Sequence, residues 1–163
     1  MLKEIYENVV NHLRDAIIEC YNKRLISICV FGSVGRGTPG PSSDIDILIV
    51  ANPLPKGRVR RVQEFEKVEE TLYPMIKQAM KKDIFIEISP VIKTPSEMNQ
   101  GSWLFLDIIE DGKILYDYNN FLFNYFKKLK DKLNQLGSKR IKQGESWFWI
   151  LKETLKPGEV IDI

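Results

Sequence analysis

Two aspartates separated by one residue, Asp44 and Asp46, stand at the start of an otherwise apolar stretch that ends at Val50. Residues two apart in a β-strand point to the same face, so the carboxylates are expected to project together, with α-carbons about 6.6 Å apart. Neighbouring carboxylates repel each other and are costly to desolvate unless a cation lies between them. Since hard oxygen ligands favour Mg²⁺ or Mn²⁺ and no His or Cys is nearby, the pattern predicts a divalent metal site.

A third acid, Glu87, lies within the apolar run Ile84–Ile88, which predicts a strand. A buried carboxylate without a partner is expensive, so Glu87 is expected to have one. If this strand pairs beside residues 44–50, Glu87 can face the same metals as the two aspartates. Asp83 shares that face by the period of two, but it stands at the solvated start of the strand and is interpreted as structural.

Gly32 and Ser33 directly follow the apolar run Leu25–Phe31, which predicts a buried strand. A glycine lets the backbone approach an anion closely, the following N–H groups can form an anion-binding nest or begin a short helix, and the serine hydroxyl adds a donor. Arg36 is near enough in sequence to add positive charge beside a phosphate. A glycine-rich turn between two strands explains the glycines alone, but not why the turn leads directly to paired aspartates.

Two other phosphate-binding motifs are excluded. Residues 35–40 fit G-x-G-x-x-G, but the dinucleotide fingerprint must open a helix, and here Pro41 and then a predicted strand follow. A Walker A loop needs a lysine after its last glycine, and this loop has none.

The elements that must position these residues alternate between helix and strand, which predicts an α/β or α+β fold with a small sheet. Helices are expected at residues 2–21, 57–80, 103–109 and 120–136, and strands at 25–31, 44–50, 84–88 and 114–116. Pro74 is expected to kink or split the second helix. Residues 32–43, with four glycines and two prolines, are expected to form no regular element, and a small hairpin and an extended tail follow the last helix.

Composition sets the class of protein. The chain has 163 residues, 44% hydrophobic and 28% charged, which suits one soluble globular domain and excludes wholesale disorder. No apolar stretch is long enough to cross a bilayer and the N-terminus lacks a signal-peptide pattern, so a cytoplasmic protein without membrane contact is expected. Cys20 and Cys29 are expected to be free thiols and His12 to lie at the surface. Because the net charge is only +2, any nucleic-acid role must come from local clustering of charge.

Gly32-Ser33, ten intervening residues and Asp44-Ile45-Asp46 resemble the signature of the nucleotidyltransferase superfamily that includes DNA polymerase beta and kanamycin nucleotidyltransferase. The amino-acid sequence of residues 31–37 and 42–50 looks especially like that of the minimal nucleotidyltransferases of prokaryotes. The resemblance covers about residues 10 to 116, with the family's order of elements.

The resemblance implies a nucleotidyltransferase fold, which is a small mixed sheet with helices packed on it, and a set of functional residues. Asp44 and Asp46 would bind two Mg²⁺ ions, with Glu87 as the third carboxylate at a position that is more often aspartate. Gly32 and Ser33 would hold the β- and γ-phosphates of a nucleoside triphosphate, expected to be ATP. Arg36 and Ser43 complete the expected nucleotide-binding residues. The implied reaction is a two-metal transfer of a nucleoside monophosphate to a hydroxyl acceptor on a protein, an RNA or a small molecule, with release of pyrophosphate.

The chain is expected to divide into a core, residues 1–118, and a helix and hairpin extension packed on it, residues 119–163. Seven basic residues stand between Phe121 and Lys142 against one acid, Asp131. They form either a solvated helix face or a contact for a phosphate backbone or an acidic partner, helped by the aromatic run 147–149. Minimal nucleotidyltransferases are often encoded beside a helical HEPN partner protein. The alternative function is therefore a catalytically weak nucleotide-binding antitoxin that acts by binding such a protein.

Overall fold

The computed structural model describes all residues, 1–163, as two compact units, Met1–Leu122 and Phe123–Ile163. Each unit is described by itself. The division falls in the first turn of the last long helix, α6 (Phe121–Leu136). No helix combines the length and the apolar character that crossing a bilayer requires.

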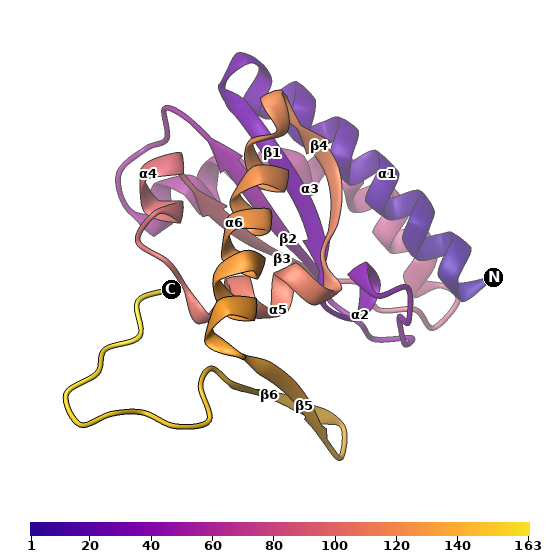
Figure 1. Ribbon diagram of the computed structural model, residues 1–163. Coiled ribbons are helices and arrows are strands. Elements are labelled where there is room, and N and C mark those ends of the chain that lie inside the picture. Colours follow the sequence, from indigo (N-terminus) through magenta and orange to yellow (C-terminus); the bar gives the residue numbers. More distant parts are fainter. The chain divides into compact units, whose positions relative to one another are not determined.

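The first unit is built on a four-stranded sheet in the order β3-β2-β1-β4 (Figure 1). The strands are β1 (Leu25–Phe31), β2 (Ile45–Ala51), β3 (Ile88–Lys93) and β4 (Lys113–Asp117). β1 runs antiparallel to both β2 and β4, whereas β2 and β3 are parallel, so the sheet is mixed. The expected class, a small mixed sheet with helices packed on it, is confirmed.

Two long helices, α1 (Leu2–Tyr21) and α3 (Arg58–Met80), cover one face of the sheet (Figure 1). Both follow from apolar residues that recur every three or four positions and so form one buried stripe. The core joins α1 residues such as Leu13 to α3 residues such as Phe65 and to the isoleucines of β2, Ile45, Ile47 and Ile49. α3 continues through Pro74 as one helix, so the expected split does not occur.

The shorter elements of this unit are α2 (Gly32–Gly35), α4 (Pro95–Met98), α5 (Trp103–Asp111) and the 3₁₀ turns at Asn22–Arg24 and Tyr118–Asn120. The turn α2 corrects the expectation that residues 32–43 contain no regular element. Both cysteines are free and His12 is exposed, as expected. The expected strand at 84–88 is wrong, because β3 begins at Ile88 and continues through Pro90. Proline is tolerated there because β3 is an edge strand, where a missing N–H breaks no ladder bond.

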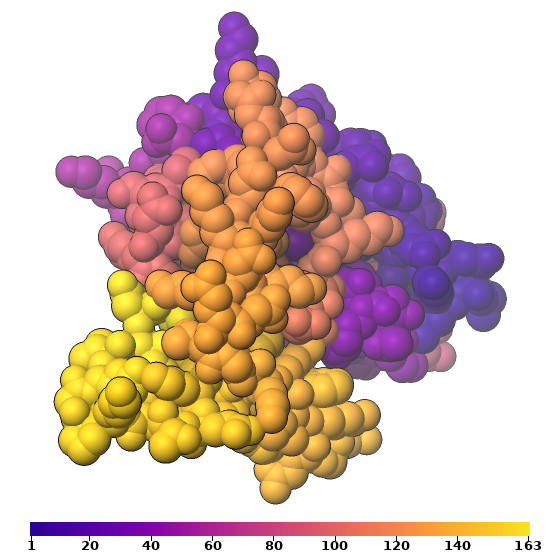
Figure 2. All heavy atoms as spheres, in the orientation of Figure 1, coloured from indigo at the N-terminus to yellow at the C-terminus, as the bar shows by residue number.

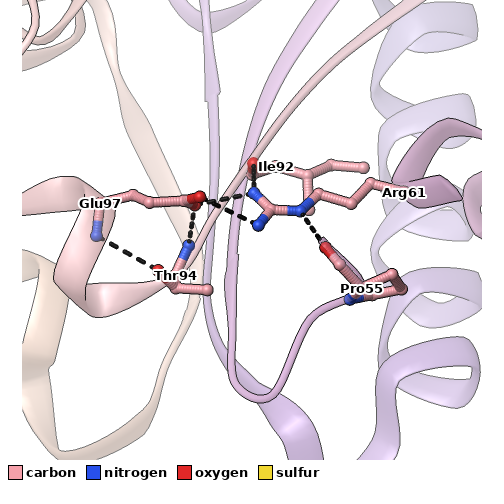
Figure 3. A network of polar contacts seen from close by, with 5 residues as sticks. All are labelled: Pro55, Arg61, Ile92, Thr94 and Glu97. Atoms are coloured by element: carbon pink, nitrogen blue, oxygen red, sulfur yellow. Dashed lines mark hydrogen bonds and ion pairs between the residues drawn. The ribbon is translucent and has the colours of Figure 1, made fainter. Parts of the chain in front are cut away.

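A network of polar contacts joins the start of α3 to α4 near the end of β3 (Figure 3). Arg61 donates from Nε to Pro55 O at 2.8 Å and from Nη1 to Ile92 O at 3.1 Å. Its Nη1 and Nη2 also reach the two carboxylate oxygens of Glu97, at 2.7 and 2.9 Å. Glu97 and Thr94 form a capping box at the start of α4. Hydrogen bonds from Arg61 first, and from Thr94, lower the pKa of Glu97 to about 2.

The second unit contains most of α6 and a two-stranded hairpin, β5 (Lys139–Gln143) and β6 (Ser146–Ile150). The helix ends at Gly137, which adopts φ +70°, a conformation that favours glycine. The hairpin that the sequence predicts after this helix is confirmed. Residues 151–163 contain no helix or strand.

Candidate active site

The register of the sheet brings the glycine-serine turn to the aspartates. In the β1–β2 pair, Phe31 lies opposite Asp46. The next residue, Gly32, therefore begins its turn at the same end of the sheet as Asp46. Gly32 adopts φ +66°, and a β-carbon at this position would overlap Oδ2 of Asp46. Only glycine therefore allows the backbone to approach the carboxylate this closely. Ser33 lies within the same turn, α2.

The two aspartates differ in their surroundings. Asp46 is half-buried in β2, and its neighbours Ile45 and Ile47 are fully buried in the core on the opposite face. Asp44 is exposed and directly precedes the strand. Burial first, and the nearby Asp44 carboxylate second, raise the pKa of Asp46, while Arg36 acts to lower it. The carboxylate of Asp46 is thus in a place that favours the arrival of positive charge.

Ser43, which directly precedes Asp44, is held on several sides. Tyr6 of α1 donates its hydroxyl to Ser43 O at 2.9 Å and accepts from Ser43 N at 3.1 Å. The Ser33 hydroxyl donates to Ser43 Oγ at 3.1 Å, and Gly40 N donates to the same oxygen at 2.8 Å. Two of the expected nucleotide-binding residues, Ser33 and Ser43, are therefore in direct contact. The sequence does not predict this contact of Tyr6. Its ring fits the buried apolar stripe of a helix, and that pattern does not show which group its hydroxyl binds.

Arg36 lies beside the turn but is joined to another residue. Its Nη1 contacts Oδ2 of Asp111 at 2.6 Å, and Asp111, at the end of α5, is buried. A β-carbon on Gly35 would meet the carbonyl oxygen of Asp111, so α2 and the end of α5 are closely packed. From the sequence, Asp111 is expected only to mark the end of a helix. Nothing in the residues around it predicts an ion pair with Arg36, 75 positions away.

Glu87 does not lie where the sequence predicts it. It precedes β3 instead of lying inside a strand, and its side chain is exposed while Ile84 and Ile86 are buried. The expectation of a buried acid within an apolar run is therefore wrong. Its backbone is nevertheless close to the aspartates, because Ile45 N donates to Glu87 O at 2.8 Å. Asp83, also exposed, adopts φ +57° at the end of the turn after α3.

The acids of this site suit a hard cation in chemistry, but they are not gathered into a ready-made cage. No group of three or more His, Cys, Asp or Glu side chains in residues 1–163 is arranged to hold a metal ion. Asp44 and Asp46 influence each other electrostatically and offer only carboxylate oxygens, the donor type that Mg²⁺ prefers. Mg²⁺ commonly binds through one or two carboxylates together with substrate phosphates, so this pair fits that ion.

A cavity of about 360 Å³ lies beside the glycine-serine turn in the first unit. Its lining includes the backbone from Val34 to Gly37, and it also includes Tyr6 and Lys113. Asp44 and Asp46 are not part of its wall. Asp44 is exposed and Asp46 is half-buried, so a ligand can approach their carboxylates from solvent.

Comparison with known proteins identifies the family. The model of the nucleotidyltransferase domain family matches residues 11–116, which agrees with the extent expected from the motifs. A protein of Methanocaldococcus jannaschii named "Putative protein adenylyltransferase MJ1305" is 30% identical over 150 residues, which cover 86% of this chain and 95% of that protein.

A solved structure shows the same fold. The spectinomycin adenyltransferase AAD(9) from Enterococcus faecialis, crystallised with ATP and spectinomycin, matches with a TM-score of 0.53 and 18% identity over 80% of this chain and 66% of that chain. A toxin-antitoxin structure with AMP-PNP matches with a TM-score of 0.43 and 19% identity over 81% of this chain and 92% of that chain. The match of the family model and the identity to the archaeal protein show that the chain belongs to the nucleotidyltransferase domain family, a family of enzymes.

Proposed function

We propose that this enzyme transfers AMP from ATP to a hydroxyl group of an acceptor and releases pyrophosphate, in a reaction that depends on Mg²⁺. One observation carries the proposal: the backbone of Gly32 lies directly against the carboxylate of Asp46. An anion-binding turn and two acids thus occur side by side, as the transfer of a nucleotide phosphate requires. The name of the archaeal relative and the ATP-bound adenyltransferase support ATP as the donor.

The residues of the turn are proposed to hold the triphosphate. Backbone N–H groups that follow Gly32 and the hydroxyl of Ser33 would donate to the terminal phosphates. In the free protein the single hydroxyl proton of Ser33 is donated to Ser43 Oγ, so this hydrogen bond would be exchanged for one to a phosphate when the ligand binds. Arg36, held by Asp111 and about one-third exposed, adds positive charge beside the phosphates without moving.

The acids are proposed to hold the metal and to receive the proton. Asp44 and Asp46 would bind Mg²⁺, and Glu87, whose backbone is bonded beside them, would complete the set by turning its exposed side chain. The positive charge of an Mg²⁺ ion held by these carboxylates would offset the charge of the departing pyrophosphate and would lower the pKa of the acceptor hydroxyl. The acceptor oxygen bonds to the α-phosphorus, the bond from that phosphorus to the bridging oxygen breaks, and the hydroxyl proton passes to a carboxylate of the site.

The acceptor is proposed to be a hydroxyl of another protein. This rests on the name of the archaeal relative, which shares 30% of its residues over 95% of its length. A seryl, threonyl or tyrosyl hydroxyl has the required nucleophile and needs no other chemistry from the enzyme.

The test is thermal unfolding of the full chain with each of the four nucleoside triphosphates, with and without Mg²⁺. A ligand at a hundred times its dissociation constant stabilises by about 2.7 kcal/mol, which corresponds to roughly 5 to 10 °C at this size. ATP with Mg²⁺ is expected to give this shift in the wild type and not in Asp46→Asn.

The matched control is Asp83→Asn, the same change at an exposed aspartate whose φ of +57° asparagine adopts equally well. It is expected to keep the full shift. A shift that persists in Asp46→Asn, or that does not need Mg²⁺, would contradict the proposal.

A further inference from the structure

The second unit differs from the first in charge. Residues 123–163 contain nine Lys and Arg against five Asp and Glu, a net charge of +4, whereas residues 1–122 contain 15 against 17, a net charge of −2. The balanced total of the chain therefore conceals a basic second unit. Such a local excess of positive charge attracts polyanions.

The hairpin sorts its side chains onto two unlike faces. Arg140 pairs with Trp149 and Lys142 with Trp147, and since residues two apart share a face, these four side chains lie on one side of the ribbon. The other side carries the pairs Lys139 with Ile150, Ile141 with Phe148, and Gln143 with Ser146. One face thus combines two cations with two tryptophans, and it has no acid.

The cationic groups of this face are already stacked on an aromatic ring. The guanidinium carbon of Arg140 lies 4.5 Å from the centroid of Trp147, and Nζ of Lys142 lies 5.7 Å from it. This geometry is a cation–π arrangement that holds the charges over the face of the indole. Trp147 still has 43% of its surface exposed, and Lys142 is exposed as well. The hairpin lies at the surface of the view in Figure 2, where it continues from the end of α6.

A flat aromatic surface next to fixed positive charges fits one ligand chemistry: a base with a phosphate on each side. A nucleobase stacks on an exposed indole whatever its sequence, and Arg or Lys beside the ring reaches the backbone phosphates. An acidic peptide would use the charges but gain little from the ring. Four further exposed lysines on α6 of the same unit, Lys127, Lys128, Lys130 and Lys132, add to the attraction.

We propose that the hairpin face formed by Arg140, Lys142, Trp147 and Trp149 binds single-stranded nucleic acid, with a base stacked on Trp147 and phosphates bound by the two basic residues. This binding goes beyond nucleotidyl transfer and does not depend on ATP, on Mg²⁺ or on the identity of the acceptor. It gives the enzyme a second ligand, held by its second unit.

The test measures binding of fluorescently labelled 12-nucleotide RNA and DNA strands of mixed sequence to the full chain by anisotropy, without nucleotide or Mg²⁺. Trp147→Ala is expected to weaken binding between about 5-fold and 150-fold, the range for loss of one base–aromatic stack. Trp147→Phe, which keeps a ring, is expected to retain most of the affinity. Lys142→Gln is expected to reduce the slope of log affinity against log salt by about 0.7, the value for one lost phosphate contact on a single strand.

Matched controls come from the opposite face of the same ribbon. Lys139→Gln removes the same charge from β5, and Phe148→Ala removes an aromatic ring of 41% exposure from β6. Both are expected to bind as the wild type does. The RNA and DNA arms distinguish the two sources of the ligand, and binding of either supports the proposal.

Two results would overturn it: no binding of either strand at 50 mM salt, or equal losses from the two faces. Retention of the ATP shift by Trp147→Ala separates this site from the active site. A chain that fails to bind nucleic acid but keeps its Mg²⁺-dependent ATP shift leaves the proposed transferase function standing.

Discussion

Two carboxylates, one near each end of β2, are in opposite situations. At its start, Asp46 is half-buried beside another acid, and the arginine nearby, Arg36, is joined to Asp111. Close to the other end, Glu97 is held by both terminal nitrogens of Arg61 and by the N–H of Thr94 (Figure 3). The pKa is raised in the first carboxylate and lowered to about 2 in the second.

The difference distinguishes Asp46, a carboxylate without a full counter-charge, from Glu97, a carboxylate whose counter-charge the protein itself supplies. Glu97 is a structural acid, because the protein itself supplies its partners and gains stability from them. Asp46 is left in need of a cation, which is what a site for a metal and a triphosphate requires. The comparison predicts that changes near Glu97 alter stability and leave nucleotide binding intact, whereas changes near Asp46 act mainly on binding.

The largest expected effect on stability comes from Arg61→Met. Arg61 is 13% exposed, and its loss leaves the Glu97 carboxylate and the carbonyls of Pro55 and Ile92 without their donor. Removal of one partner of a largely buried ion pair is expected to lower the free energy of unfolding by about 3 kcal/mol, measured by urea denaturation.

The matched control is Arg58→Met, an exposed arginine three residues earlier in α3. It is expected to change the free energy of unfolding by less than about 0.5 kcal/mol. Arg61→Met should melt at a lower temperature than the wild type and still show the full rise in melting temperature when ATP and Mg²⁺ are added. A loss of nucleotide binding without loss of stability would break the comparison.

The next largest effect is expected from Gly32→Ala. A left-handed backbone costs about 1 to 2 kcal/mol for alanine, and the new methyl group overlaps the Asp46 carboxylate. The free energy of unfolding is therefore expected to fall by about 2 kcal/mol, and the ATP shift should disappear. In a double-mutant cycle with Asp46→Ala the penalty should shrink to the backbone part, because the overlap is gone. Additive losses would mean that the two residues do not touch.

Gly32 and Asp46 also show what the sequence could predict. The glycine-serine turn, the acidic strand and their spacing could be predicted from the sequence. A glycine after a strand permits a close approach of the backbone, and acids two apart in a strand share a face. The order of the elements followed from apolar periodicity in the same way, and the mixed sheet followed from the resemblance to the family. The pairing of Phe31 with Asp46 shows that the chain, after the glycine-serine turn, returns to the same end of the sheet, so the two motifs meet there.

Other features of the site were not readable, for identifiable reasons. The placement of Glu87 inside a buried strand was wrong because an extended segment and a strand share the same alternation of apolar residues, and only sheet pairing distinguishes them. Asp111 was missed because an ion pair between residues 75 positions apart leaves no local pattern. The contact of Tyr6 with Ser43 was missed because a tyrosine in an apolar stripe is explained by its buried ring alone, without its hydroxyl. These contacts depend on tertiary structure, and a single sequence does not encode them in its spacing.

The smallest effect is expected from acid, and its sign differs between the two ends of β2. Glu97 has a folded pKa of about 2 against an ordinary 4.5, so its stabilisation is complete above pH 4.5 and is lost as pH falls toward 2. Because about one-third of its side chain is exposed, the loss should amount to about 1 to 2 kcal/mol. Asp46 acts in the opposite direction: its raised pKa means that protonation relieves a penalty, so it gains stability as pH falls. In urea denaturation between pH 2 and 6, Glu97→Gln should therefore flatten the acid loss, whereas Asp46→Asn should steepen it. Identical pH profiles for the two variants would show that these carboxylates do not differ in the way that their partners imply.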